Sequence, residues 1–293
     1  MKLLTPTQPA ELPAEALLAR LRCRRAALDL SATHATVAAA EAFSWVYQRL
    51  NRRLRRRLEP FFDLLAMRSL VLTLRYTLAG EAPPTAVVRS TLLAEAWQDL
   101  VTGPGETETK VARLEAALAP DYSFAVGLAR TYRSQGPGGV EQQLADGILQ
   151  HGLTRAGNEI LKITLRYLID MRNCLMIGKL WHWQVSQVPP LIAGGTIATA
   201  SLQRIWAARD SDRLTRIVVK LAREPVASSK PVAMEQCLLN GLTRLMRHAG
   251  RDPLGMGVII EYLWRIQLAE HNQVLRQALT VERSELLEEV LLI

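Results

Sequence analysis

Apolar residues recur at helical spacing along most of the chain. Between residues 43 and 65 they form one stripe, made of Val46, Leu50, Leu54, Leu58, Phe61 and Leu65. Spacings of three and four residues place these side chains on one face of an α-helix. Pro60 interrupts the stretch and predicts either a bend or the first turn of a new helix.

Clusters of Gly, Pro and Ser divide this pattern into segments. They lie at residues 80–84, 102–108, 134–139, 188–195, 223–231 and 248–257. Between them there is no convincing run of alternating apolar and polar residues, which a half-buried β-strand would show. The sequence therefore predicts an all-α protein of about a dozen helices.

Two helical segments, residues 163–179 and 262–278, share polar positions as well as apolar ones. Each carries an arginine and, seven residues later, an asparagine: Arg166 and Asn173 in the first, Arg265 and Asn272 in the second. Seven residues are two helical turns, so the arginine and the asparagine lie on the same face. Residues 61–77 fit this frame less well, because Ser69 stands at the asparagine position.

The aligned positions 69, 173 and 272 are 104 and 99 residues apart. Each of the first two is followed by a proline pair and then a tryptophan: Pro83–Pro84 with Trp97, and Pro189–Pro190 with Trp206. We therefore predict a single helical domain over residues 1–293 that is built of three similar units, roughly residues 1–105, 106–210 and 211–293. Chance similarity among amphipathic helices is the alternative.

The polar residues inside the apolar segment 167–183 need partners, because a buried polar atom without one costs about 1–3 kcal/mol. They belong to a stripe along one helix edge, formed by Lys162, Arg166, Asp170 and Asn173. Arg166 and Asp170 are spaced for an ion pair. Catalysis by Asp170 would require a partner acid, base or metal, and the sequence identifies none. We interpret the stripe as structural, binding loops or a neighbouring unit.

Charge adds a second feature to this picture. The net charge of +8 comes from 30 arginines and only 6 lysines against 28 acidic residues. The densest basic run comprises Arg49, Arg52, Arg53, Arg55, Arg56 and Arg57. It is either a solvated helix face or a patch that binds an acidic protein or lipid headgroups. Nucleic acid is the less favoured partner, because no helix-turn-helix or zinc module accompanies the run.

Candidate chemistry is otherwise sparse. The five histidines and three cysteines show no metal-ligand spacing, and no phosphate-binding loop or nucleophile motif is present. We expect no catalytic residue, no cofactor, no metal and no small-molecule substrate. The scattered cysteines are typical of a reducing cytosol. The longest uncharged segment, residues 180–202, contains prolines and glycines, and we see no signal peptide, so we expect a soluble chain.

Residues 165–205 and 252–279 together resemble the C subunit of V/A-type rotary ATPases, which is called subunit d in eukaryotes. Members of that family carry a D/E-x-x-N helix followed by a basic residue and then a GG-x-[IL] turn. The matching residues are Asp170, Asn173, Lys179 and the turn Gly194–Gly195–Thr196–Ile197. Tyr262–Leu263 and Asn272 match the last repeat of the family, whereas Ala269 and His271 depart from it.

The resemblance implies a funnel-like all-α fold with three helical units around a pseudo-threefold axis. It also implies a non-catalytic role. Such a subunit connects the central stalk to the membrane proteolipid ring and transmits torque for proton or sodium transport, so its partners are the ring and the stalk subunits. Its location would be cytoplasmic and peripheral to the membrane. The alternatives are a helical scaffold or adaptor of another assembly and an arginine-rich nucleic-acid-binding protein.

Overall fold

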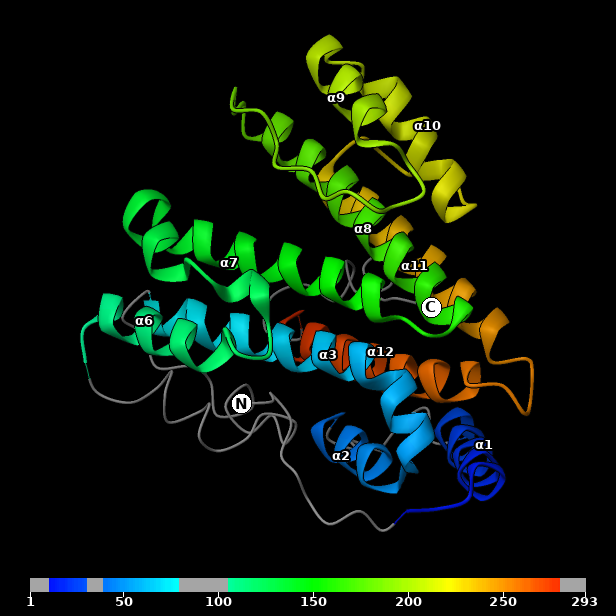
Figure 1. Ribbon diagram of the computed structural model, residues 1–293. Helices are drawn as coiled ribbons and strands as arrows, with labels where there is room; N and C mark the ends of the chain where they lie inside the picture. The colour runs from blue at the N-terminus through cyan, green and yellow to red at the C-terminus, as the bar shows by residue number, and fades with distance from the viewer. Residues whose placement is uncertain (1–10, 31–38, 79–104, 280–293) are drawn as a thin grey trace. The chain divides into compact units, whose positions relative to one another are not determined.

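The structure is a computed structural model that describes residues 11–30, 39–78 and 105–279. Within these ranges it contains ten α-helices, one 3₁₀ helix and no strand, which confirms the all-α prediction for this part of the chain (Figure 1). The chain divides into two compact units. The first consists of Met1–Leu12 with Ala40–Leu161, and the second of Pro13–Ala39 with Lys162–Ile293.

The first unit is built mainly of four helices: α2 (Ala39–Arg49), α3 (Arg52–Leu78), α6 (Thr107–Leu118) and α7 (Leu128–Arg155), with the short 3₁₀ helix η1 (Ser123–Ala125). Helix α7 packs against both α3 and α6, as Figure 1 shows. All six residues of the predicted apolar stripe are buried in this unit. The periodicity therefore identified a true core face.

One break lies elsewhere than the sequence predicted. It falls at Leu50–Asn51, where the Asn51 side chain accepts a hydrogen bond from the Leu54 amide at 2.9 Å and so begins α3. Pro60 lies inside α3, so it does not begin a new helix. The predicted break at residues 134–139 is confirmed, because Gly136 has a non-helical φ of 68° and ψ of −162° and divides α7 into two helical segments. The chain reverses there, since the Thr131 hydroxyl donates to Oε1 of Gln143 at 2.6 Å.

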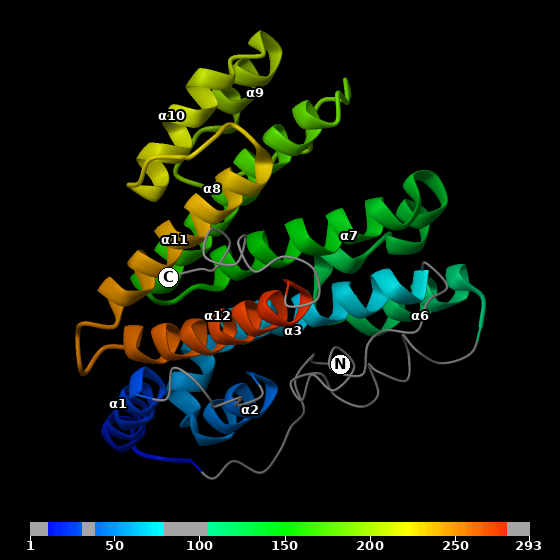
Figure 2. The same cartoon turned by 180° about the vertical axis from the view of Figure 1, so that it is seen from behind.

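The second unit contains α1 (Ala14–Leu30), most of α8 (Glu159–His182), α9 (Thr199–Ala208), α10 (Ser211–Ala222), α11 (Pro231–Ala249) and α12 (Gly257–Leu279). An apolar cluster joins α8, α9, α10 and α11, and Figure 2 shows α10 beside α11. The indole rings of Trp181 and Trp206 stack in this cluster with their centroids 5.9 Å apart.

A buried ion network joins α1 to α12 within this unit. The carboxylate of Glu261 accepts hydrogen bonds from Nη1 of Arg25 at 2.7 Å and from Nε of Arg265 at 2.8 Å. The Glu261 side chain is only 2% exposed. Because a carboxylate is buried at low cost only when it is paired, these two arginines make its position possible.

The predicted threefold arrangement is not shown by these two units, and it stays a prediction together with its boundaries at residues 105 and 210. The three aligned positions 69, 173 and 272 do fall in three long helices, α3, α8 and α12. Pro83–Pro84 and Trp97, which supported the first repeat, lie outside the described residues.

The three cysteines differ in accessibility, and this gives a direct test of the second unit. Cys23 is exposed, whereas Cys174 and Cys237 are buried. Burial raises the pKa of the Cys174 thiol to about 12 and also raises that of Cys237. We expect the native protein to show one rapidly reacting thiol with a disulfide reagent at about pH 8, and the denatured protein to show three, because the thiolate is the reactive form. A Cys23→Ser variant should then show no rapid reaction, and a second rapid thiol in the native protein would contradict the described packing.

Candidate functional site

The centre of α8 carries a buried acid that binds the loop leading to α9. Asp170 is fully buried. Its Oδ2 accepts hydrogen bonds from the Thr196 amide at 2.8 Å and from the Thr196 hydroxyl, and its Oδ1 accepts one from the Ile197 amide at 3.1 Å. Both carboxylate oxygens are therefore used, and the loop is fixed immediately before the first turn of α9.

One turn further along the same face of α8, Asn173 binds the same loop at a second point. Its side-chain amide donates to the carbonyl of Ile192 at 2.8 Å, and its Oδ1 accepts from the Ile192 amide at 2.8 Å. Asn173 and Ile192 are both buried. Since a buried backbone group needs a partner, this pair of bonds replaces the partners that a helix would have supplied. We call Asp170, Asn173 and the residues 192–197 that they bind the loop clasp.

Glycine is needed at the two neighbouring positions 194 and 195 of the loop clasp for different structural reasons. Gly194 has a φ of 98°, which favours glycine. At Gly195 a Cβ atom would overlap Oδ1 of Asp170 and press against Ile169. The acid can therefore approach the loop backbone only because residue 195 has no side chain.

The other motif positions do not join the loop clasp. Arg166 is exposed and forms no ion pair with Asp170 among the described residues, because that carboxylate is turned to the loop. Lys179 pairs with Glu235 of α11 at 3.4 Å. Arg265 belongs to the Glu261 network and so differs from its aligned partner Arg166. Asn272 is half-buried in α12.

The basic run of residues 49–57 lies on α2 and α3 and is only partly free for a partner. Arg49 stacks over the Trp45 ring at 4.5 Å. Arg55 lies over the Tyr47 ring at 5.3 Å and donates to the carbonyl of Leu50 at 2.9 Å. The exposed members are Arg52, Arg53, Arg56 and Arg57. The candidate patch thus consists of four arginines rather than six.

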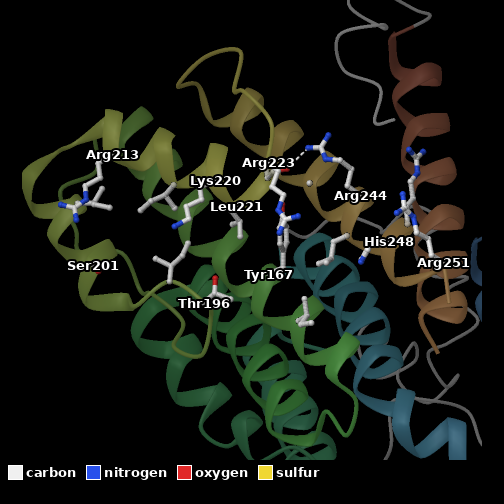
Figure 3. A pocket seen from close by; sticks show the side chains of 18 residues that line it. Tyr167, Thr196, Ser201, Arg213, Lys220, Leu221, Arg223, Arg244, His248 and Arg251 are labelled. Carbon is white, nitrogen blue, oxygen red and sulfur yellow. Dashed lines mark hydrogen bonds between the residues drawn. The ribbon is translucent and has the colours of Figure 1, made fainter. Parts of the chain in front are cut away.

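Sequence reasoning missed a large basic groove in the second unit, which we call the α10–α11 groove. Its volume is about 1120 Å³. Its cationic lining comes from α10, α11 and the residues that directly follow them, and consists of Arg213, Lys220, Arg223, Arg244, Arg247 and Arg251 (Figure 3). Its apolar lining comes from α8, α9, α10, α11 and the loop clasp, and consists mainly of Ile163, Ile197, Ile205, Ile217, Leu221 and Leu245.

The groove has an unbalanced charge. None of its lining residues, which all lie in the described part of the chain, is an aspartate or a glutamate. Arg244 pairs with nearby Glu224 and donates to the Ala222 carbonyl at 2.7 Å. The other five cations have no carboxylate within ion-pair distance among the described residues. Tyr167 is neutral, because burial raises its pKa, and its hydroxyl hydrogen is already donated to the Leu238 carbonyl at 2.8 Å.

The loop clasp shapes one side of this groove. Thr196 and Ile197, whose amides bind Asp170, are both lining residues. Gly241 of α11 lets the helices approach, because a Cβ there would overlap the hydroxyl of Tyr167 and press on Ala222. The loop residues that line this side of the groove are therefore held in place by their hydrogen bonds to Asp170.

Within the described ranges, no group of three or more His, Cys, Asp or Glu residues is placed to hold a metal ion. No helix in those ranges is both long and apolar enough to cross a membrane. Comparison of the chain with models of known protein families and with curated proteins finds no match.

Proposed function

We propose that the chain is a non-catalytic connecting subunit of a V/A-type rotary ATPase. In this role it links the central stalk to the membrane proteolipid ring and transmits torque for proton or sodium transport. It works at the cytoplasmic face of the membrane without spanning it. The proposal rests on the resemblance of the D-x-x-N helix and glycine turn, and on one structural observation that is independent of those motifs.

That observation is a recurring order of helices. Helices α6 and α10 have 12 residues each and begin at residues 107 and 211, which are 104 residues apart. Helix α7, which Gly136 divides into two segments, and the undivided α11 follow, beginning at residues 128 and 231, which are 103 residues apart. In both cases the short helix packs on the long one, and a further long helix, α8 or α12, comes next.

A repeated order of elements at a constant spacing is the signature of a tandem repeat. The spacing also agrees with the 104 residues between positions 69 and 173, although it was obtained from helix bounds alone. The C subunit family is built of three such helical units, so the observation supports that family over an unrelated scaffold. The loop of residues 192–197, which buried hydrogen bonds hold in place, also suits a subunit that must be rigid to transmit torque.

A tagged full-length chain purified in mild detergent from the cells that express it tests this proposal. We expect proteolipid and central-stalk subunits to co-purify with it in fixed ratio, identified by mass spectrometry. A tagged chain of similar charge and size serves as the control for non-specific capture. Recovery of the folded chain without either partner would contradict the proposal and favour a helical adaptor of another assembly, which the basic groove would also suit.

A further inference from the structure

The α10–α11 groove has two surfaces that no described residue covers. Its apolar side includes Ile163 of α8, which is 42% exposed although it is a large aliphatic residue. Its cationic side carries five arginine or lysine side chains without carboxylate partners among the described residues. Clustered cations repel one another, so a ligand that brings negative charges stabilises the folded unit as it binds.

The spacing of the cations argues against a compact anion as the ligand. On α10, Arg213 and Lys220 are seven residues apart, which is about 10 Å along a helix. Arg244 and Arg251, at the end of α11 and just beyond it, are also seven residues apart. Figure 3 shows the labelled cations spread across the whole view from Arg213 to Arg251 instead of converging on one point. A single phosphate or carboxylate would meet only some of them.

The apolar side argues for an occupant that is amphipathic and extended. Six aliphatic residues line the groove together with the cations. An amphipathic helix offers carboxylates along its edge at intervals of three and four residues and an apolar stripe beside them. Binding of such a helix in an apolar groove is a common mode of protein recognition. The groove volume of about 1120 Å³ is sufficient for several side chains.

We propose that the α10–α11 groove binds an acidic amphipathic helix of a partner protein, with the helix carboxylates on Arg213, Lys220 and Arg251 and its apolar stripe on the aliphatic lining that includes Ile163. This inference goes beyond the proposed function, because it holds for any assembly in which the chain takes part. The loop clasp keeps Thr196 and Ile197 in place before binding, so this side of the groove needs little ordering when the helix associates.

Fluorescence anisotropy with the full-length chain tests the inference. The probe is a fluorescein-labelled peptide of about 18 residues with a leucine stripe and glutamates beside it, long enough to become helical on binding. We expect saturable binding that weakens as ionic strength rises from about 0.1 M to about 1 M, which shortens the Debye length from about 10 Å to about 3 Å. Peptides with glutamine in place of glutamate, or serine in place of leucine, should each bind at least about tenfold more weakly.

Paired variants locate the site. The double variant Lys220→Glu/Arg251→Glu should weaken binding of the glutamate peptide about tenfold or more, because rim charges are reversed. Ile163→Ser should weaken it several-fold. The control Arg20→Glu/Arg130→Glu makes the same change in net charge at two exposed arginines on other helices, outside the groove, and should change affinity less than about twofold. Circular dichroism spectra that match those of the parent establish that each variant is folded.

Several results would overturn the inference. They are the absence of saturable binding, equal weakening by the control pair, and undiminished binding of the peptide that lacks its leucine stripe. Vesicles of phosphatidylserine and a single-stranded RNA are tested in parallel. If either binds through Lys220 and Arg251 while the peptide does not, the groove recognises lipid headgroups or nucleic acid instead of a helix.

Discussion

Asp170→Ala is expected to lower the free energy of unfolding by roughly 2–4 kcal/mol, because three hydrogen bonds to a buried carboxylate are lost. The loss should be visible in urea unfolding followed by circular dichroism. The amides of Thr196 and Ile197 should exchange with solvent faster than in the parent. Asp170→Asn should recover only part of the loss, because an amide offers one acceptor oxygen where the carboxylate uses two.

Gly195→Ala should also lower stability, because it disturbs the same contact between Asp170 and the loop by changing the loop instead of the acid. Its methyl group would overlap Oδ1 of Asp170, so the loop must move and the hydrogen bonds must lengthen. Gly157→Ala is the matched control, because a Cβ at that position has no heavy atom within 4 Å. Asp212→Ala, at an exposed acid of α10, is the control for loss of a carboxylate. A parent-like stability in Asp170→Ala would show that the loop clasp contributes little.

Glu261→Ala is expected to cost a similar amount, roughly 2–4 kcal/mol, because it leaves Arg25 and Arg265 without their shared carboxylate and opens a cavity in the core. Urea unfolding measures the total loss. Hydrogen exchange should report it most strongly in α1, because Arg25 joins that helix to α12. The arginines are 31% and 25% exposed, so water partly replaces the lost partner and keeps the cost below that of a fully enclosed pair.

The exposed pair Lys179–Glu235 provides the contrast for this experiment. Its side chains are 39% and 44% exposed and lie 3.4 Å apart. Glu235→Ala should change stability by less than about 1 kcal/mol, since exposed ion pairs contribute little. Equal losses of unfolding free energy in Glu235→Ala and Glu261→Ala would contradict the assignment of Glu261 as the buried carboxylate whose ion pairs join α1 to α12.

Local features of the fold were readable from the sequence, because helical periodicity is a local property. The stripe from Val46 to Leu65 is buried, and the breaks before α11 and α12 fall where glycine and proline cluster. The break inside α7 at residues 134–139 was also readable, because Gly136 adopts a non-helical conformation there. At Pro60 no new helix begins, because α3 continues through this residue and packs against α7.

The candidate site was only partly readable. The spacing of Asp170 and Asn173 on one helix face, with a glycine pair downstream, follows from the sequence alone, whereas their bonds to residues 192–197 depend on where the loop returns. The α10–α11 groove depends on four helices and a loop meeting in space. Its sequence signals were the basic residues of 213–223 and of 244–251, and a solvated helix face would show the same spacing.

The contact between Asp170 and Gly195 restricts how this sequence can diverge. Any larger residue at position 195 removes the space for the acid, and loss of the acid removes the reason for keeping a glycine there. The two positions should therefore change together in distant relatives, while the cationic lining of the groove varies with the partner. A search that scores position 170, position 173 and the glycine pair as one linked pattern should find such relatives where overall similarity has faded.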